Sequence, residues 1–187
     1  MLLPIDTIIR DFLALRGESP DLLPLLEEGE ESAVLTLRRA LEVRLAAAAV
    51  EATMQIDLFS LDELREVERP EVLAADGGRL TVRLPSDFLR LHTLRMADWK
   101  DAVHSVEQQG TLRQALGAAM PQWMACPEKP LVMLRRDTRG PYLSVRGSRA
   151  TEALSLIFVP QPVLDGDTLT LSRAAYPLLL EILNRQL

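Results

Sequence analysis

The stretch RLTVRLPSDFLRLHTLRMADWKDAV, residues 79–103, decides how the whole chain is interpreted. Apolar and polar side chains alternate along its first part. The apolar ones are Leu80, Val82 and Leu84, and the polar ones are Arg79, Thr81 and Arg83. This alternation is typical of a strand with one buried face, and the residues after Pro85 continue in a mostly strand-like pattern as far as Trp99. The stretch therefore predicts β-structure in the middle of the chain.

Turn signals on both sides of this stretch predict further hairpins. Asp76-Gly77-Gly78 supplies residues that accept positive φ, so a tight turn is expected between strands near 70–75 and 79–84. Gly140-Pro141 marks the bend of a second hairpin within LVMLRRDTRGPYLSVRG, residues 131–147. A strand is expected over 153–160, where prolines follow, and another turn around Gly166.

The two ends of the chain carry helical patterns. Residues 5–15 have apolar side chains near helical spacing, and Gly17 ends this segment. Residues 30–54 form the strongest periodic segment, with a stripe at steps of three and four. Its members are Val34, Leu37, Leu41, Leu45, Ala48 and Ala52. A last helix is expected to begin close to Pro177, because proline is tolerated in a first turn.

This order of elements predicts an α+β fold. We expect a helical bundle, made by a long N-terminal helix and a C-terminal helix, with an inserted antiparallel β-rich region. The predicted chain is a single domain over 1–187, helical over 1–64 and 172–187 and β-rich over 70–162. The long helix, 31–53, is expected to pack on the last one, with Leu37, Leu41 and Leu45 meeting Leu178, Leu179, Ile182 and Leu183.

Composition limits the classes of protein to consider. Hydrophobic residues make up 48% and aromatic residues 4% of the 187, so an aliphatic core is expected. No apolar run reaches the roughly 18 residues that cross a bilayer, and the N-terminus lacks the pattern of a signal peptide. Cys126 is the single cysteine and forms no internal disulfide, which favours a reducing compartment.

Charge is unevenly distributed along the chain. Residues 1–78 carry 7 Lys/Arg and 17 Asp/Glu, a net charge of −10, whereas residues 79–187 carry 14 and 10, a net charge of +4. The overall charge of −6 argues against wholesale nucleic-acid binding. Either an acidic helical face is simply solvated, or the subunit meets different partners at its two ends.

Motifs for catalysis or cofactor binding are lacking in the sequence. There is no glycine-rich phosphate loop, and two histidines with one cysteine cannot build a Cys/His zinc site. His92, His104 and Cys126 are interpreted as structural residues. We therefore expect no enzymatic activity, no catalytic residue, no metal and no cofactor.

The basic cluster RRDTRG, residues 135–140, is the candidate functional element. Arg135, Arg136 and Arg139 lie at or near a predicted hairpin tip. Such a tip is either an exposed loop kept soluble by charge or a contact for a DNA backbone or an acidic neighbour, since phosphate contact needs only positive charge.

The opening stretch resembles a segment of the head–tail adaptor proteins, or tail tubular ring proteins, of short-tailed and crAss-like bacteriophages. The residues that carry the resemblance are Leu84, Pro85, Asp87, Phe88, Arg90, Leu91 and Trp99. The order YLSVRG, ALSLIFVPQP and a terminal helix is also similar. The resemblance covers most of the chain loosely, while residues 105–130 and the N-terminal PDLLPLLEEG have no match.

The resemblance implies a virion structural protein that forms a homo-oligomeric ring between portal and tail. Its partners would be other copies of itself, the portal and tail proteins, and DNA in the ring's channel, with no membrane. It would be assembled in the bacterial host cytoplasm. Two alternatives stay open: a non-viral α+β small-molecule binding module or small enzyme, and, less favoured by the acidic balance, a regulatory nucleic-acid binder.

Overall fold

The computed structural model describes residues 1–18, 28–75, 79–107 and 124–186. The chain divides into two compact units. The first, here called the helical unit, consists of Met1–Glu63 and Gln161–Leu187, and the second, the β unit, of Leu64–Pro160. The helical unit carries 7 Lys/Arg against 16 Asp/Glu, and the β unit 14 against 11. The net charges are therefore −9 and +3.

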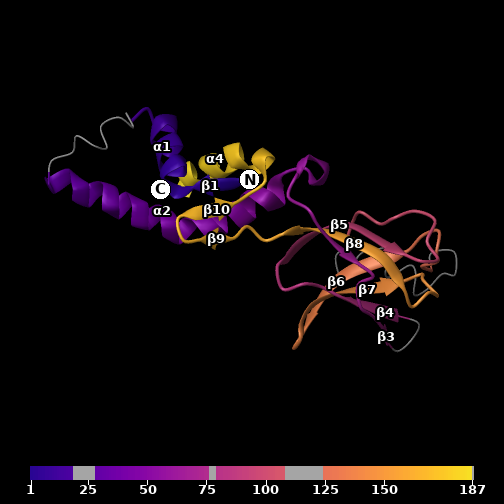
Figure 1. Cartoon of the computed structure of the whole chain (residues 1–187). Coiled ribbons are helices and arrows are strands. Elements are labelled where there is room, and N and C mark those ends of the chain that lie inside the picture. The colour runs from indigo at the N-terminus through magenta and orange to yellow at the C-terminus, as the bar shows by residue number, and fades with distance from the viewer. Residues whose placement is uncertain (19–27, 76–78, 108–123, 187) are drawn as a thin grey trace. The chain divides into compact units, whose positions relative to one another are not determined.

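The helical unit is built from both ends of the chain (Figure 1). Its elements are β1 (Leu2–Pro4), α1 (Ile5–Leu15), α2 (Glu28–Gln55), η2 (Leu58–Ser60), β9 (Leu164–Asp165), β10 (Thr168–Thr170), η4 (Arg173–Ala175) and α4 (Tyr176–Gln186). Strand β10 lies between β1 and β9, and all pairs are antiparallel. The first and last segments of the chain are therefore held together by backbone hydrogen bonds.

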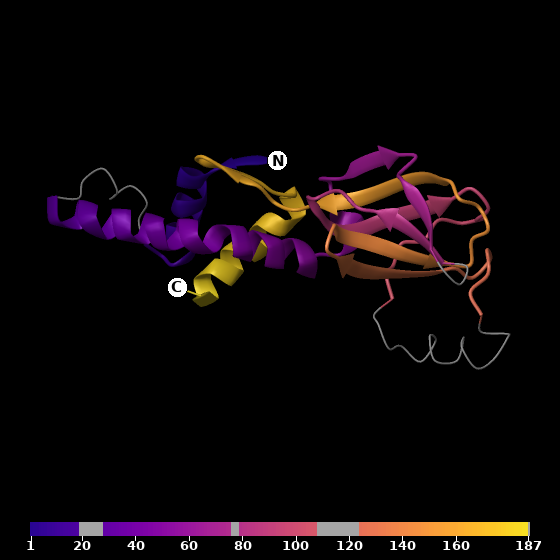
Figure 2. The same ribbon diagram turned by 90° about the horizontal axis from the view of Figure 1, so that it is seen from below.

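Helices α2 and α4 cross and pack against each other (Figure 2). The alanines Ala48, Ala49 and Ala52 are fully buried, which fits close approach between the two elements, because a methyl group adds little thickness. The larger side chains of the same core are Leu41 and Leu45 of α2, Leu179, Ile182 and Leu183 of α4, and Ile8 and Phe12 of α1. The predicted packing of these two helices is confirmed, although Leu37's side chain lies outside the described residues.

In the described part of the β unit, the strands form two antiparallel sheets. Its strands are β2 (Arg65–Glu68), β3 (Val72–Ala75), β4 (Arg79–Arg83), β5 (Phe88–Met96), β6 (Leu131–Asp137), β7 (Gly140–Arg146) and β8 (Ala153–Pro160). One sheet has the order β2-β8-β5 and the other β3-β4-β7-β6. Val82, Leu143 and Val145 of the second sheet share one core with Leu94 and Phe158 of the first. The two sheets thus pack face to face as a sandwich.

The predicted fold class, a helical bundle with an inserted β-rich region, is wrong. Ten strands in three antiparallel sheets dominate the described residues, which contain only three α-helices, one of them at the C-terminus. Strands also occur in the segments assigned to the bundle. Residues 2–4 pair with Thr168–Thr170, because the short alternating segment at each end finds a partner in the other. A long helical pattern is easy to detect within one segment of sequence. An alternating segment of two or three residues is too short to be recognised as a strand, so the sequence favours the helices.

The hairpins are confirmed where the structure describes them. Strands β3 and β4 pair with Ala75 opposite Arg79, although the predicted turn, 76–78, lies outside the described residues. Strands β6 and β7 pair from Leu131 opposite Arg146 to Asp137 opposite Gly140. The bend therefore comes at Thr138–Arg139, two residues earlier than the Gly-Pro pair suggests.

Candidate functional site

The face of the four-stranded sheet that lies in the sandwich is apolar, whereas the opposite face is mixed, with Leu131 and Met133 of β6 buried among polar side chains. Leu80, Val82, Leu143 and Val145 are buried in the sandwich. Because side chains alternate along a strand, the residues between them lie on the opposite face, here called the outer face. The ladder of β4 and β7 places Thr81 opposite Ser144 and Arg83 opposite Tyr142. Continued by one residue, the same register places Arg79 beside Arg146 at the end of the ladder.

Strand β6 adds a further arginine to the outer face. Arg135 lies opposite Tyr142, and Met133 lies opposite Ser144. Arg135, Tyr142 and Ser144 therefore occupy the same face as Arg79 and Arg146. The outer face of β4, β7 and β6 is consequently rich in hydrogen-bond donors, because guanidinium groups offer donors only.

One end of this face is neutralised within the unit. Arg83 forms an ion pair of 2.9 Å with Asp137, and its guanidinium lies 5.5 Å from the centre of the Tyr142 ring. The Asp137 carboxylate also accepts a hydrogen bond from the backbone N–H of Arg139 at 2.8 Å. Asp137 is thus already engaged at the base of the hairpin tip.

The other three arginines of the outer face lack an acidic partner among the described residues. No ion pair joins Arg79, Arg135 or Arg146 to a carboxylate there. The Nε atoms of Arg135 and Arg146 are buried without a hydrogen-bond partner. Burial, together with the charges of Arg79 and Arg135, lowers the pKa of the Arg146 guanidinium. These three side chains are called the arginine cluster below.

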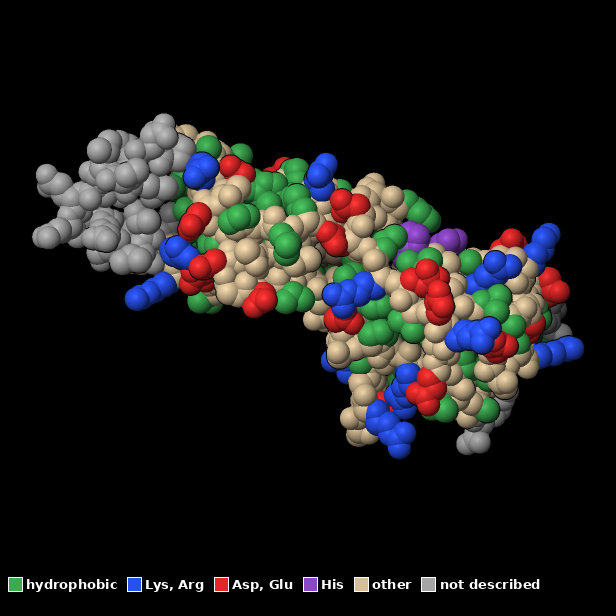
Figure 3. Space-filling view, in the orientation of Figure 1, with side chains coloured by type: hydrophobic (Ala, Val, Ile, Leu, Met, Phe, Trp, Pro, Cys, Tyr) green, Lys and Arg blue, Asp and Glu red, His purple; other side chains and the backbone are tan. Residues whose placement is uncertain are grey.

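The structure separates the three arginines that are grouped in the sequence. Arg135 belongs to the outer face, whereas Arg136, the next residue of β6, points to the other side and is exposed. Arg139 is exposed in the turn. Figure 3 shows basic side chains gathered with an acidic one over the β6–β7 hairpin tip. Arg136 and Arg139 therefore form an exposed basic tip, distinct from the arginine cluster.

Arg79 and Arg146 were missed by sequence reasoning as site residues. The signal was present in the alternation of RLTVR and YLSVR, which puts an arginine, a hydroxyl residue and another polar side chain on one face of each strand. What the sequence did not reveal was the pairing of β4 with β7. That pairing joins residues about 65 positions apart, such as Leu80 and Val145, with more than 50 residues between the two strands.

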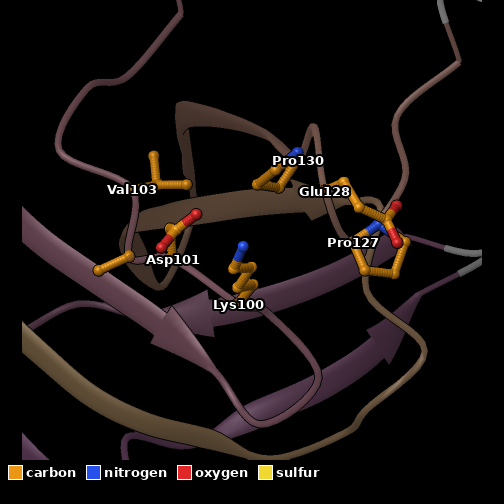
Figure 4. Close-up of a pocket in the computed structure, with 7 residues that line it drawn as sticks. Lys100, Asp101, Val103, Pro127, Glu128 and Pro130 are labelled. Atoms are coloured by element: carbon orange, nitrogen blue, oxygen red, sulfur yellow. The ribbon is translucent and has the colours of Figure 1, made fainter.

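A shallow pocket of about 370 Å³ lies at the loop after β5. Lys100 and Asp101 contribute from this loop and Glu128 from the turn that precedes β6, with Pro127 and Pro130 beside it (Figure 4). The carboxylate of Glu128 has a lowered pKa, mainly because of its own backbone N–H and the Cys126 side chain. Among the described residues that line the pocket there is no histidine or hydroxyl nucleophile.

The two histidines lie side by side on the β unit. Their rings are 6.2 Å apart and nearly perpendicular. A hydrogen bond of 3.0 Å joins Nδ1 of His104 to the backbone carbonyl of His92, so this nitrogen carries the proton. Burial, and then the neighbouring His104, lowers the pKa of His92. The described residues include no group of three or more His, Cys, Asp or Glu arranged to hold a metal ion.

The end of the opening stretch fixes a neighbouring loop. Asp98 accepts hydrogen bonds from the Ser148 hydroxyl at 2.6 Å and the Arg149 N–H at 2.7 Å. The indole N–H of Trp99, which is 3% exposed, donates to the Gly147 carbonyl at 3.1 Å. The Asp98-Trp99 pair therefore anchors the turn between β7 and β8, which is a structural role.

We expect Asp98→Ala to cost roughly 1–3 kcal/mol of unfolding free energy at neutral pH, because it removes a charged acceptor of several hydrogen bonds. Burial raises the pKa of Asp98, but bonds from Ser148, Arg149 and Ala150 lower it overall. A lowered folded-state pKa contributes stability above the unfolded value, and this contribution is lost as the pH falls through the folded value.

Denaturant melts of both proteins between neutral and acid pH check this prediction. The difference between wild type and variant should shrink below about pH 4, where the unfolded carboxyl protonates. Asp101→Ala, which removes an exposed carboxylate three residues away, is the control and should change stability little. A cost independent of pH would show that Asp98 acts through packing rather than charge.

No protein-family model matches the chain, and no curated protein matches it. In the part of the chain that the structure describes, none of the helices has the length and apolar character needed to span a membrane.

Proposed function

We propose that the protein is a structural subunit of a bacteriophage head–tail connector, assembled as a homo-oligomeric ring between portal and tail. The observation that carries the proposal is the opposite charge of the two units, −9 for the helical unit and +3 for the β unit. The resemblance of the Leu84–Trp99 stretch to the adaptor proteins supports it. In this proposal the subunit works in the virion and has no catalytic role.

A ring needs a head-to-tail contact in which two different surfaces of each copy meet. Opposite net charges on the two units provide electrostatic complementarity for such a contact, since the β unit of one copy attracts the helical unit of the next. If both contacting surfaces carried charge of the same sign, neighbouring copies would repel each other. The charge asymmetry thus favours association of copies in one orientation.

The exposed basic tip is the proposed contact element. Arg136 and Arg139 are exposed, and neither forms an ion pair with a carboxylate among the described residues. The tip projects from a hairpin of two seven-residue strands that are fully paired, so its position on the β unit is well defined. We propose that the tip contacts the acidic helical unit of the neighbouring copy. The alternative contact is with DNA in the channel of the ring.

Reversing both charges, Arg136→Glu with Arg139→Glu, is expected to weaken assembly at least about tenfold, because two attractive contacts become repulsive. Electron microscopy and light scattering of the purified protein measure ring formation against concentration. Wild-type assembly should also weaken with salt, because exposed charges are screened. Rings formed equally well by the variant would contradict the role of the tip in assembly.

DNA retention separates the two targets of the tip. Contact with DNA in the channel would be independent of sequence and strongly weakened by salt, because it depends on counterion release. Replacing Arg136 and Arg139 with Ser should then lower DNA retention while rings still form. A double variant that assembles and retains DNA normally would leave the tip only a solubilising role.

A small-molecule binding module is the second candidate, and the pocket beside Lys100 favours it. Its lining of one lysine and two carboxylates fits a small zwitterionic ligand better than an apolar one. A ligand screen read by thermal stabilisation tests this candidate. Stabilisation that is lost in Lys100→Ala, in a protein that forms no rings, would replace the connector proposal.

A further inference from the structure

We propose that the arginine cluster, Arg79, Arg135 and Arg146, is a binding site for an oxyanion of the phosphate class on the outer face of the four-stranded sheet. This site is separate from the exposed basic tip and does not depend on ring assembly. It is formed by three strands of one sheet, so the backbone holds its side chains in place.

Strand register brings the three side chains together. Leu80 pairs with Val145, so the residues next to them, Arg79 and Arg146, are neighbours on the same face. Arg135 extends from β6, the strand on the other side of β7, on that same face. The residue between them on the outer face of β7 is Ser144, which is only 5% exposed.

The cluster has unmet hydrogen-bonding capacity. A buried donor without an acceptor costs free energy, so such atoms are rare in native structures. Here two occur in one cluster, the Nε atoms of Arg135 and Arg146. The carboxylate of Asp137, in the same strand as Arg135, is already bound by Arg83 and by a backbone N–H. The cluster thus has hydrogen-bonding capacity that the described residues do not use.

The chemistry of the cluster selects the ligand class. Guanidinium groups match phosphate oxygens with paired, charge-assisted hydrogen bonds. Three positive charges that no carboxylate of the described residues pairs with suit a ligand with more than one negative charge and several acceptor oxygens. The hydroxyls of Thr81 and Ser144, paired across the strands on this face, can add donors. A phosphate group meets these requirements, whereas a single carboxylate would leave donors unused.

Like charges held close together without a counter-charge destabilise the folded protein, and departures of this kind are expected at functional sites. Burial, and then repulsion from Arg79 and Arg135, lowers the pKa of Arg146. Removing one of the arginines is therefore expected to stabilise the ligand-free protein. A merely structural arginine would instead lower stability when replaced, so this readout separates the two roles.

Calorimetric titration of the full chain with inorganic phosphate and with pyrophosphate, at low ionic strength, tests the proposal. Both anions should bind, pyrophosphate more tightly because it carries more charge. Arg146→Gln and Arg79→Gln should each weaken binding at least about tenfold, since a charge-assisted pair is lost. Arg95→Gln, which removes an exposed arginine from β5 in the other sheet of the β unit, is the control and should bind like the wild type.

A short DNA duplex added to the pyrophosphate complex identifies the source of the phosphate. Displacement of pyrophosphate assigns the site to a nucleic-acid backbone, and binding of pyrophosphate that the duplex leaves unchanged assigns it to a free phosphate compound. Either result supports an oxyanion-binding site at the arginine cluster.

Melting in phosphate-free buffer gives the second readout. The midpoint of Arg146→Gln should lie above that of the wild type, and added pyrophosphate should raise the wild-type midpoint more than that of the variant. The proposal is overturned if neither the anions nor the duplex binds, or if Arg95→Gln weakens binding as much as the cluster variants.

Discussion

Replacing Gly147 with alanine is expected to destabilise the β unit by roughly 2–6 kcal/mol, through backbone strain together with overpacking. Gly147 has a φ of +84°, which L side chains rarely adopt. A Cβ at this position would also lie 2.7 Å from both the backbone nitrogen and the backbone oxygen of Cys126. Both obstacles are backbone atoms, so no side chain can rotate away to relieve the contact.

The same glycine also takes part in a hydrogen bond. Its carbonyl accepts the indole N–H of Trp99, and the turn that follows is held by Asp98. A shift of the Gly147 backbone away from Cys126 would therefore strain the contacts at the end of β5. The lost stability is expected to appear as a lower denaturant midpoint for the β unit.

Tryptophan fluorescence measures this effect selectively, because both tryptophans of the chain, Trp99 and Trp123, belong to the segment Leu64–Pro160. Gly140→Ala is the matched control. Gly140 has a φ of +115°, but a Cβ at this position would meet no atom within 4 Å, so only strain of about 1–3 kcal/mol is expected. Equal losses in the two variants would show that the approach to Cys126 does not matter.

Local alternation predicts much of the β unit. RLTVR, LVMLRRD and ALSLIFVP have the period and flanking turn residues of strands, and each of these segments is a strand. Local patterns say little about which strands pair, because pairing depends on contacts between segments far apart. The neighbours of β4 in the sheet are β3 and β7, not β5, and β8 lies between β2 and β5.

The same limit applies to the candidate site. The basic run RRDTRG identifies Arg135 as a candidate site residue. However, the arginines of this run, although close in sequence, lie on different faces of the hairpin in the structure. Arg135 and Arg136 point to opposite faces of β6, because side chains alternate along a strand. The partners of Arg135 come from other strands, so the arginine cluster emerges only when the sheet order is known.

The predicted fold class is wrong for a related reason. A helical stripe is visible within one segment, so periodicity favours α-structure at both ends as the framework of the fold. Strand β1 has only three residues and gains its stability from pairing with β10, which is separated from it by most of the chain. Sequence periodicity cannot detect a strand of that length, so the short terminal sheet is not expected from the sequence.

Leu41→Ala is expected to destabilise the helical unit by roughly 2–5 kcal/mol, the range for deleting a buried leucine side chain. Leu41 is 1% exposed and belongs to the core that α2 shares with α1 and α4. Its neighbours along α2 on this face are Leu45 and Ala48, also buried. Because alanines already bring the helix backbones close together, little movement is available to fill the cavity left by the mutation.

The far-UV helix signal reports this unit, because the three α-helices of the described residues all belong to it. Val43→Ala is the control: Val43 lies on the same helix but is 82% exposed, so its truncation should change stability by less than about 0.5 kcal/mol. If the two variants melted alike, the apolar stripe of α2 would not be the core in solution.

A loss in Leu41→Ala that appears in the helix signal but leaves the tryptophan transition unchanged would show that the two units unfold separately. Likewise, a loss in Gly147→Ala that appears in the tryptophan transition but leaves the helix signal unchanged would show that the two units unfold separately.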